Sequence, residues 1–89
     1  MPEIFRLFGF TYYFFSREHM PVHVHVEGKD GYAIYDLEEN SFLKRYAKGI
    51  KAGDLRRIEN ILEENKAMIV DSWKTYFNNK RYGDPGNMV

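Results

Sequence analysis

The sequence predicts an α+β fold, with four to five short, largely antiparallel strands followed by one long C-terminal helix packed across the sheet. In the first half, short runs of residues alternate between apolar and polar, and turn residues separate the runs. This two-residue period is typical of strands. From Asp54 onward, apolar residues recur at intervals of three and four, which is the period of a helix. A chain of 89 residues, 44% of them hydrophobic, can build one core.

Residues 3–8 and 10–15 are expected to form the first two strands, on either side of Gly9. Seven of the first fifteen residues are aromatic, and they fall on both faces of the second strand. A strand that is apolar on both faces is typical of a central position or of a contact surface for a partner, and we expect the core. Gly9 marks either a tight reversal or a bulge.

The third strand, at about 22–27, carries the one polar cluster of the sequence that suggests chemistry, although it does not by itself indicate a reaction. Its valines alternate with His23, His25 and Glu27, so these three polar side chains share one face. Pro21 precedes the strand, where its missing N–H does least harm. His19 lies in the loop that leads in, and the sequence does not decide whether it reaches the other two histidines.

The remaining strands follow from turn chemistry. Two glycines and an Asp-Gly pair at 28–31 predict a hairpin loop, and residues 32–37 return as a strand. A turn at 38–41 leads to a short basic strand at about 42–47, which suits the edge of a sheet.

The predicted helix starts at Gly53 or Asp54 and, if unbroken to Phe77, is about 36 Å long. Asn65 occupies one position of the apolar stripe, where it marks a bend or bonds to buried backbone. Trp73 is expected to anchor the core. We therefore expect a single α+β domain over 1–77 and a turn-rich, poorly ordered extension over 78–89.

The composition excludes several classes of protein. Without cysteines, the chain has neither a disulfide framework nor a thiolate metal site. No apolar run approaches the roughly 20 residues of a membrane span, and no signal-peptide pattern opens the chain. We expect a cytoplasmic protein that does not bind membranes.

A formal net charge of zero hides two halves of opposite sign. Residues 1–40 carry three Lys and Arg against seven Asp and Glu (3 − 7 = −4), and residues 41–89 carry ten against six (10 − 6 = +4). The densest basic stretch is opposed only by Asp54 and predicts either a solvated face or a surface for nucleic acid or an acidic partner. Its cations are Lys44, Arg45, Lys48, Lys51, Arg56 and Arg57.

The histidine cluster has three interpretations. In the first, His23, His25 and Glu27 are catalytic, because imidazole titrates near neutrality and can both take and give a proton. RNA cleavage requires a base, an acid and a cation for the phosphate, which the histidines, Glu27 and the basic stretch would supply.

In the second interpretation, His19, His23 and His25 bind zinc or a similar divalent metal, because a His-x-His pair on a strand points two imidazoles the same way. No other cofactor is expected. In the third, the histidines pair with Glu18, Glu27 or backbone carbonyls and fix the local geometry or a protein interface. The sequence leaves all three open.

Three stretches resemble an uncharacterised prokaryotic family, domain of unknown function 4160. They are the opening Met1-Pro2-Glu3-Ile4-Phe5-Arg6-Leu7-Phe8-Gly9, the run Glu18-His19-Met20-Pro21-Val22-His23-Val24-His25-Val26, and the late helix ending around Trp73. The chain keeps the acid, the three histidines and one proline of the family pattern, and it has Val22 where a second proline is common.

The resemblance assigns no reaction, but it implies a partner. Members of the family are often encoded beside another small protein, which suggests a toxin-like component of a toxin–antitoxin-type pair acting on RNA. A non-enzymatic protein–protein interaction module, a small metal-binding protein and a homo-oligomer remain alternatives.

Overall fold

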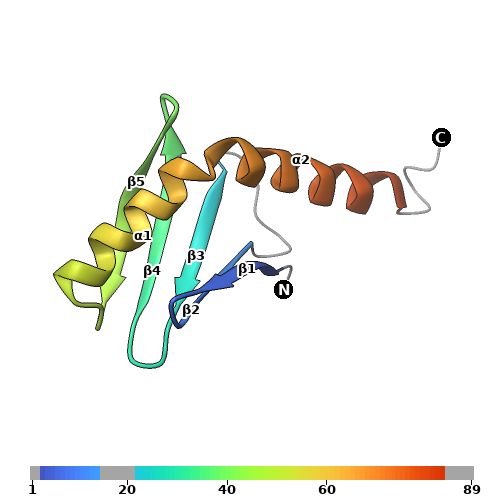
Figure 1. Cartoon of the computed structure of the whole chain (residues 1–89). Helices are drawn as coiled ribbons and strands as arrows, with labels where there is room; N and C mark the ends of the chain where they lie inside the picture. The colour runs from blue at the N-terminus through green and yellow to red at the C-terminus, as the bar shows by residue number, and fades with distance from the viewer. Residues whose placement is uncertain (1–2, 15–21, 84–89) are drawn as a thin grey trace.

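The computed structural model of the chain describes residues 3–14 and 22–83, with those from residue 78 onward described by backbone alone. Five strands precede two helices in the chain (Figure 1). The elements are β1 (Glu3–Leu7), β2 (Phe10–Tyr13), β3 (His23–Glu27), β4 (Tyr32–Glu38), β5 (Ser41–Lys48), α1 (Ala52–Glu64) and α2 (Lys66–Gly83).

The strands form one antiparallel sheet in the order β1-β2-β3-β4-β5, so each strand pairs with its neighbour in the sequence. Both helices lie on the same side of this sheet, and α2 continues beyond it (Figure 1). The α+β class and the antiparallel strands are as predicted. Neither of the two described helices has the length and hydrophobicity of a membrane span.

The prediction of one long C-terminal helix is wrong, because the helix is interrupted at Asn65. Asn65 leaves the helical region with φ −110° and ψ 16°, and its side chain donates a hydrogen bond of 2.9 Å to the carbonyl oxygen of Ile61. An asparagine side chain that bonds to nearby backbone competes with regular helix geometry. The backbone N–H of Ile69 still donates to the oxygen of Asn65, so α2 restarts at once.

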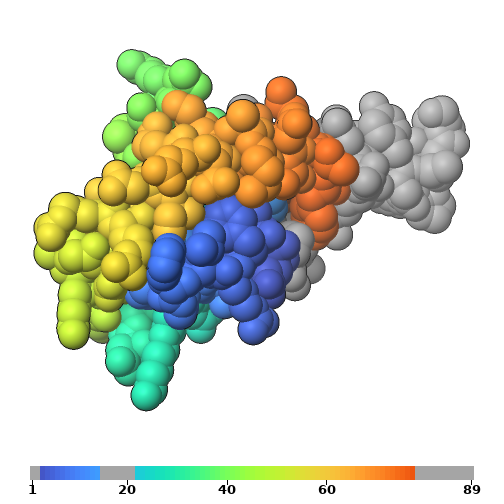
Figure 2. All heavy atoms as spheres, viewed as in Figure 1, coloured from blue at the N-terminus to red at the C-terminus, as the bar shows by residue number. Residues whose placement is uncertain are grey.

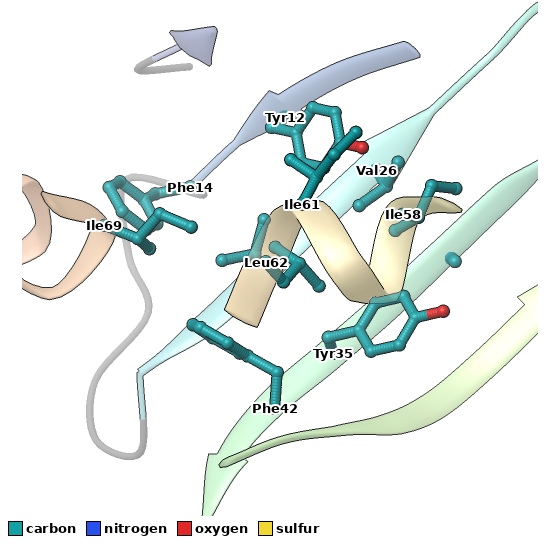
Figure 3. Packing of buried hydrophobic residues seen from close by; sticks show 11 residues of the cluster. Tyr12, Phe14, Val26, Tyr35, Phe42, Ile58, Ile61, Leu62 and Ile69 are labelled. Atoms are coloured by element: carbon teal, nitrogen blue, oxygen red, sulfur yellow. The ribbon is translucent and has the colours of Figure 1, made fainter. Parts of the chain in front are cut away.

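The core lies between the sheet and the helices (Figure 3). Ile58, Ile61 and Leu62 of α1 point toward Tyr12, Val26 and Tyr35 of the sheet, as period-three-and-four spacing requires. The other buried members of this cluster are Phe14, Val24, Ala33, Phe42 and Ile69. Trp73 packs against the cluster at partial exposure, as does Phe77, whose ring centroid lies 4.8 Å from that of Trp73.

Two tyrosines bring hydroxyl groups into this core. Tyr35 donates a hydrogen bond of 2.8 Å to Glu59 of α1, and burial followed by this carboxylate raises the pKa of Tyr35. The hydroxyl of Tyr12 is buried without a hydrogen-bond partner among the described residues. Burial raises the pKa of Tyr12 to about 12, so both groups stay neutral in the physiological range.

Two-residue reversals connect β1 to β2 and β4 to β5. Gly9 is part of a full reversal rather than a bulge, because Leu7 pairs directly with Phe10. Phe8 and Gly9 have φ values of 51° and 83°, the double left-handed conformation of a type I′ hairpin. The second reversal contains Glu39 and Asn40 in the same region.

The division of the chain into a domain over 1–77 and an extension over 78–89 stays a prediction. The backbone of α2 is helical through Gly83.

Candidate functional site

The face of the sheet opposite the helices carries the polar side chains of β3, and we call it the histidine face. The valines of β3 lie in the core, so His23, His25 and Glu27 point to the other side, as the alternation predicts. The strand register brings Tyr13 of β2 and Tyr32 of β4 to the same face, opposite His25 and Glu27 respectively.

His25 is held by two tyrosines. The residue is only 2% exposed, and its ring stacks on that of Tyr13 at 5.3 Å between centroids and 17° between planes. Its Nδ1 atom lies 2.5 Å from the hydroxyl oxygen of Tyr32. Tyr13 donates a hydrogen bond of 3.3 Å to Glu27, and burial, the Tyr32 hydroxyl and the Glu27 carboxylate raise the pKa of Tyr13. The four side chains form one connected network.

His23 faces a second cluster, centred on Asp36 of β4. Arg45 of β5 donates two hydrogen bonds, of 2.9 and 2.8 Å, to the two carboxylate oxygens of Asp36. The Nδ1 atom of His23 lies 3.6 Å from Oδ1 of Asp36, an electrostatic contact longer than a hydrogen bond. The rings of His23 and His25 meet edge to face at 5.8 Å, so the two clusters adjoin.

A bulge in β5 brings Arg45 into this arrangement. Lys44 pairs with Tyr35 and Tyr46 pairs with Ile34, so Arg45 is the extra residue of β5. Arg45 and Tyr46 consequently both reach the histidine face, where Tyr46 lies 6.1 Å from Tyr32 between ring centroids. A regular strand would have turned one of these two neighbours to the helix side.

A shallow hollow of about 520 Å³ opens at one end of the histidine face. Its side-chain lining includes a carboxylate, a cation and three phenol rings, from Tyr13, Glu27, Tyr32, Tyr46 and Lys48. The loop 28–31 and Gly49 complete its wall. His25 does not line the hollow and lies behind Tyr32, so Tyr32 connects the buried imidazole to the open space.

Glycines allow the chain segments around the hollow to approach closely. A Cβ atom on Gly31 would lie 2.5 Å from the backbone of Gly49, and Gly49 itself has a φ of 74°. Both features require glycine. The wall of the hollow is therefore formed by two backbone segments in close contact, and a side chain at either glycine would push these segments apart.

Of the predicted catalytic residues, His23, His25 and Glu27 share the histidine face, but only Glu27 lines the hollow. The predicted third metal ligand, His19, lies outside the described residues, as does Glu18. Within 3–14 and 22–83, no three His, Cys, Asp or Glu side chains are arranged to hold a metal ion. The zinc hypothesis stays a prediction.

The six cations of the basic stretch do not share one face of the sheet. Arg45 is paired with Asp36, Lys48 lines the hollow, and Lys44 lies opposite Tyr35 on the helix side of the sheet. Lys51 precedes α1, which carries Arg56 and Arg57, and the guanidinium of Arg57 lies 4.6 Å from the ring centroid of Phe8.

Sequence reasoning did not single out Tyr13 or Asp36 as partners of the histidines. A signal for Asp36 was present, because a loop over 28–31 that pairs Glu27 with Tyr32 also sets His23 opposite Asp36. The contact from Arg45 depends on the β5 bulge, for which the sequence carries no comparable signal.

Comparison with known proteins identifies the family of the chain but assigns it no activity. Neither the curated proteins nor the solved structures contain a match to the chain. The family described as Domain of unknown function (DUF4160) matches residues 9–74, which include β2 to β5, α1 and the first half of α2. The chain therefore belongs to the DUF4160 family.

Proposed function

We propose that the protein binds single-stranded RNA at the hollow of the histidine face and cleaves it, as the toxin-like member of a pair with a second small protein. The proposal is based on the side chains that surround the hollow. Glu27, Lys48 and the Tyr32 hydroxyl bonded to His25 surround a single open space, and they supply a base, a cation and an acid.

The proposed reaction is an internal transesterification. The ribose 2′-oxygen attacks the adjacent phosphorus as the bond between phosphorus and the 5′-oxygen breaks, which leaves a 2′,3′-cyclic phosphate and a free 5′-hydroxyl. Glu27 takes the proton of the 2′-hydroxyl and releases it to water. Tyr32 gives its proton to the leaving oxygen, and the ammonium of Lys48 stabilises the charge on the phosphate.

His25 acts in this scheme as a positioning residue. With Nδ1 protonated, His25 donates a hydrogen bond to the oxygen of Tyr32 and so directs the phenol proton toward the hollow. After the step, the Tyr32 phenolate takes a proton back from water in the hollow. The stack of His25 on Tyr13 holds the imidazole in place, and Tyr13 in turn donates a hydrogen bond to Glu27. The acid and the base are thus oriented by one network.

The rings around the hollow support a single-stranded ligand. Tyr46 is 45% exposed and lies beside Tyr32, so the two rings offer a surface on which unpaired bases can stack. Each stacked base contributes about 1–3 kcal/mol in proteins that bind single strands, with little preference for sequence.

The test uses purified protein and a fluorescently labelled RNA octamer, in the presence of EDTA because the proposed step uses no metal. We expect cleavage to products that end in a 2′,3′-cyclic phosphate. Glu27→Gln and Tyr32→Phe are each expected to slow cleavage about 100-fold or more, since each removes one proton-transfer group.

Glu64→Gln, at an exposed position of α1, and Tyr76→Phe, on α2, are the matched controls and should cleave like the wild type. An all-deoxy octamer lacks the nucleophile and should stay intact. RNA that remains intact with the wild type would overturn the proposed cleavage, as would full activity of both Glu27→Gln and Tyr32→Phe.

A further inference from the structure

We propose a second nucleotide subsite in which a base stacks on Phe8, with Arg57 behind the ring. This inference rests on the proposed function and extends it from a cleavage site to a path for the RNA strand. The strand would run from the hollow around the adjoining end of the sheet to the hairpin that connects β1 and β2.

Phe8 occupies a position that its side chain disfavours. Its backbone φ of 51° is left-handed, a conformation that is strained for a residue with a Cβ atom. Type I′ reversals strongly prefer Asn or Gly here, because these residues tolerate positive φ. Phe8 does not recover this cost by burial, since it is 62% exposed. A strained, exposed aromatic residue at a hairpin tip points to a contact outside the chain.

Arg57 indicates the chemistry of that contact. Its guanidinium lies 4.6 Å from the centroid of the Phe8 ring, within cation–π distance. With the cation on one face of the ring, an incoming base can stack on the other, and the same guanidinium can meet a phosphate of the strand. A ring backed by a cation therefore suits a nucleotide better than an apolar peptide.

The topology brings this hairpin to the end of the sheet where the hollow lies. In a five-stranded antiparallel meander, the β1–β2 reversal, the β3–β4 loop and the β5–α1 connection all fall at one end (Figure 1). The hairpin touches the loop, because a Cβ atom on Gly28 would lie 2.5 Å from the Phe10 ring. Figure 2 shows the same hairpin alongside α1.

This end of the molecule is also basic. The acids at this end are Glu27, Asp30 in the loop and Asp54 in the first turn of α1. Five cations outnumber these three acids. The cations are Lys29, Lys48, Lys51, Arg56 and Arg57. A phosphate backbone that leaves the hollow toward Phe8 would run along positive charge.

The test compares the affinity of a dinucleotide and an octanucleotide, both 2′-O-methylated so that they bind without being cleaved, by fluorescence anisotropy. The wild type should bind the octamer more tightly than the dinucleotide. Phe8→Asn keeps a residue that tolerates positive φ and removes the ring. This variant is expected to bind the octamer about tenfold more weakly, which is the effect of one lost stacked base. The difference in affinity between the octamer and the dinucleotide should therefore become smaller.

Phe8→Trp restores a ring and should recover the affinity, with tryptophan fluorescence quenched by the octamer. Arg57→Gln should weaken octamer binding and reduce its dependence on salt. Met68→Asn, an exposed apolar position on α2, is the control and should bind like the wild type.

The outcomes separate the two proposals. If Phe8→Asn binds the octamer as the wild type does, the subsite is overturned while the hollow remains as proposed. If the wild type binds neither oligonucleotide, both proposals fail. A loss in Phe8→Asn that Phe8→Trp does not recover also overturns the stacking contact.

Discussion

At the scale of single residues, Asp36 connects β3, β4 and β5 on the histidine face through its contacts with His23 and Arg45. It is nearly buried, it accepts both hydrogen bonds from Arg45, and it lies against His23. A buried carboxylate requires such compensation, because charge removed from water is costly unless it is paired and hydrogen-bonded. Arg45, which is half exposed, supplies it from the neighbouring strand.

Asp36→Asn should lower the free energy of unfolding by about 1.5–3 kcal/mol, the usual contribution of hydrogen bonds to a charged group. The amide keeps the size of the side chain and loses one acceptor and the charge. Urea unfolding measures the change. Asp71→Asn, at an exposed position of α2, is the control and should stay within about 0.5 kcal/mol of the wild type. Equal stability of both variants would refute the role of Asp36.

The sequence predicted the histidine face but not the partners of its histidines. Alternation of valine and histidine along β3 suffices to say which side chains share a face, because the period of a strand is a local property. Which residue lies opposite His25 depends on the register between strands. Where β5 bulges at Arg45, that register changes in a way no local pattern records.

At the scale of elements, a carboxylate at the end of α1 joins the helix to the first residues of β5. Glu63 accepts a hydrogen bond of 3.0 Å from the backbone N–H of Phe42 and a second one of 3.3 Å from the ammonium of Lys66. Lys66 also donates to the carbonyl oxygen of Asn40 in the β4–β5 reversal. The junction of the two helices is thereby fastened to one end of the sheet.

These contacts make stability depend on pH. The hydrogen bond from the Phe42 N–H is the main cause that lowers the pKa of Glu63 in the folded protein; partial burial opposes it, and Lys66 lowers the pKa further. A lowered pKa means that the ionised form is stabilised by folding. The contribution is therefore complete above the unfolded pKa of about 4.3 and is lost as pH falls through the lower folded value.

Glu63→Gln should reduce stability by at most about 1 kcal/mol near neutrality, since the side chain is half exposed and solvent screens its charge. The difference from the wild type should shrink below about pH 4. Urea unfolding at several pH values measures it. Glu64→Gln, the neighbouring exposed position, is the control. A difference that stays constant down to acid pH would show that the carboxylate charge is not involved.

The break between α1 and α2 could not be read from apolar spacing. The stripe continues in phase from Leu62 to Ile69, because both residues enter the same core. The interruption comes from the side chain of Asn65, which bonds to the carbonyl of Ile61. Asparagine at one position of the stripe was visible in the sequence, but whether it bends a helix depends on such a contact.

At the scale of the whole molecule, one core joins the sheet to both helices. Leu62 is fully buried near the centre of this core, with Ile61 of α1 beside it (Figure 3). Ile69 brings α2 into the same cluster. Within the described part of the chain this cluster joins the sheet, α1 and α2, so the loss of one central side chain should affect the entire fold.

Leu62→Ala should cost about 2–5 kcal/mol, through lost burial and the cavity that remains. That is a large part of the roughly 5–15 kcal/mol that stabilises a typical domain. At about 4–8 °C per kcal/mol for a domain of this size, the midpoint of thermal unfolding should fall by about 10 °C or more. Met68→Ala, an exposed position on α2, is the control. A fall of only a few degrees would contradict the central position of Leu62.

The order of the strands also bears on how the chain reaches this structure. Each strand pairs with the strand before or after it, so ordering the sheet needs no long loop to close before its contacts form. Folds dominated by such local contacts have low contact order and fold faster than sheets with distant pairings. We therefore expect the sheet to form early, with Tyr12, Tyr35 and the valines of β3 exposed on one face of it until α1 docks.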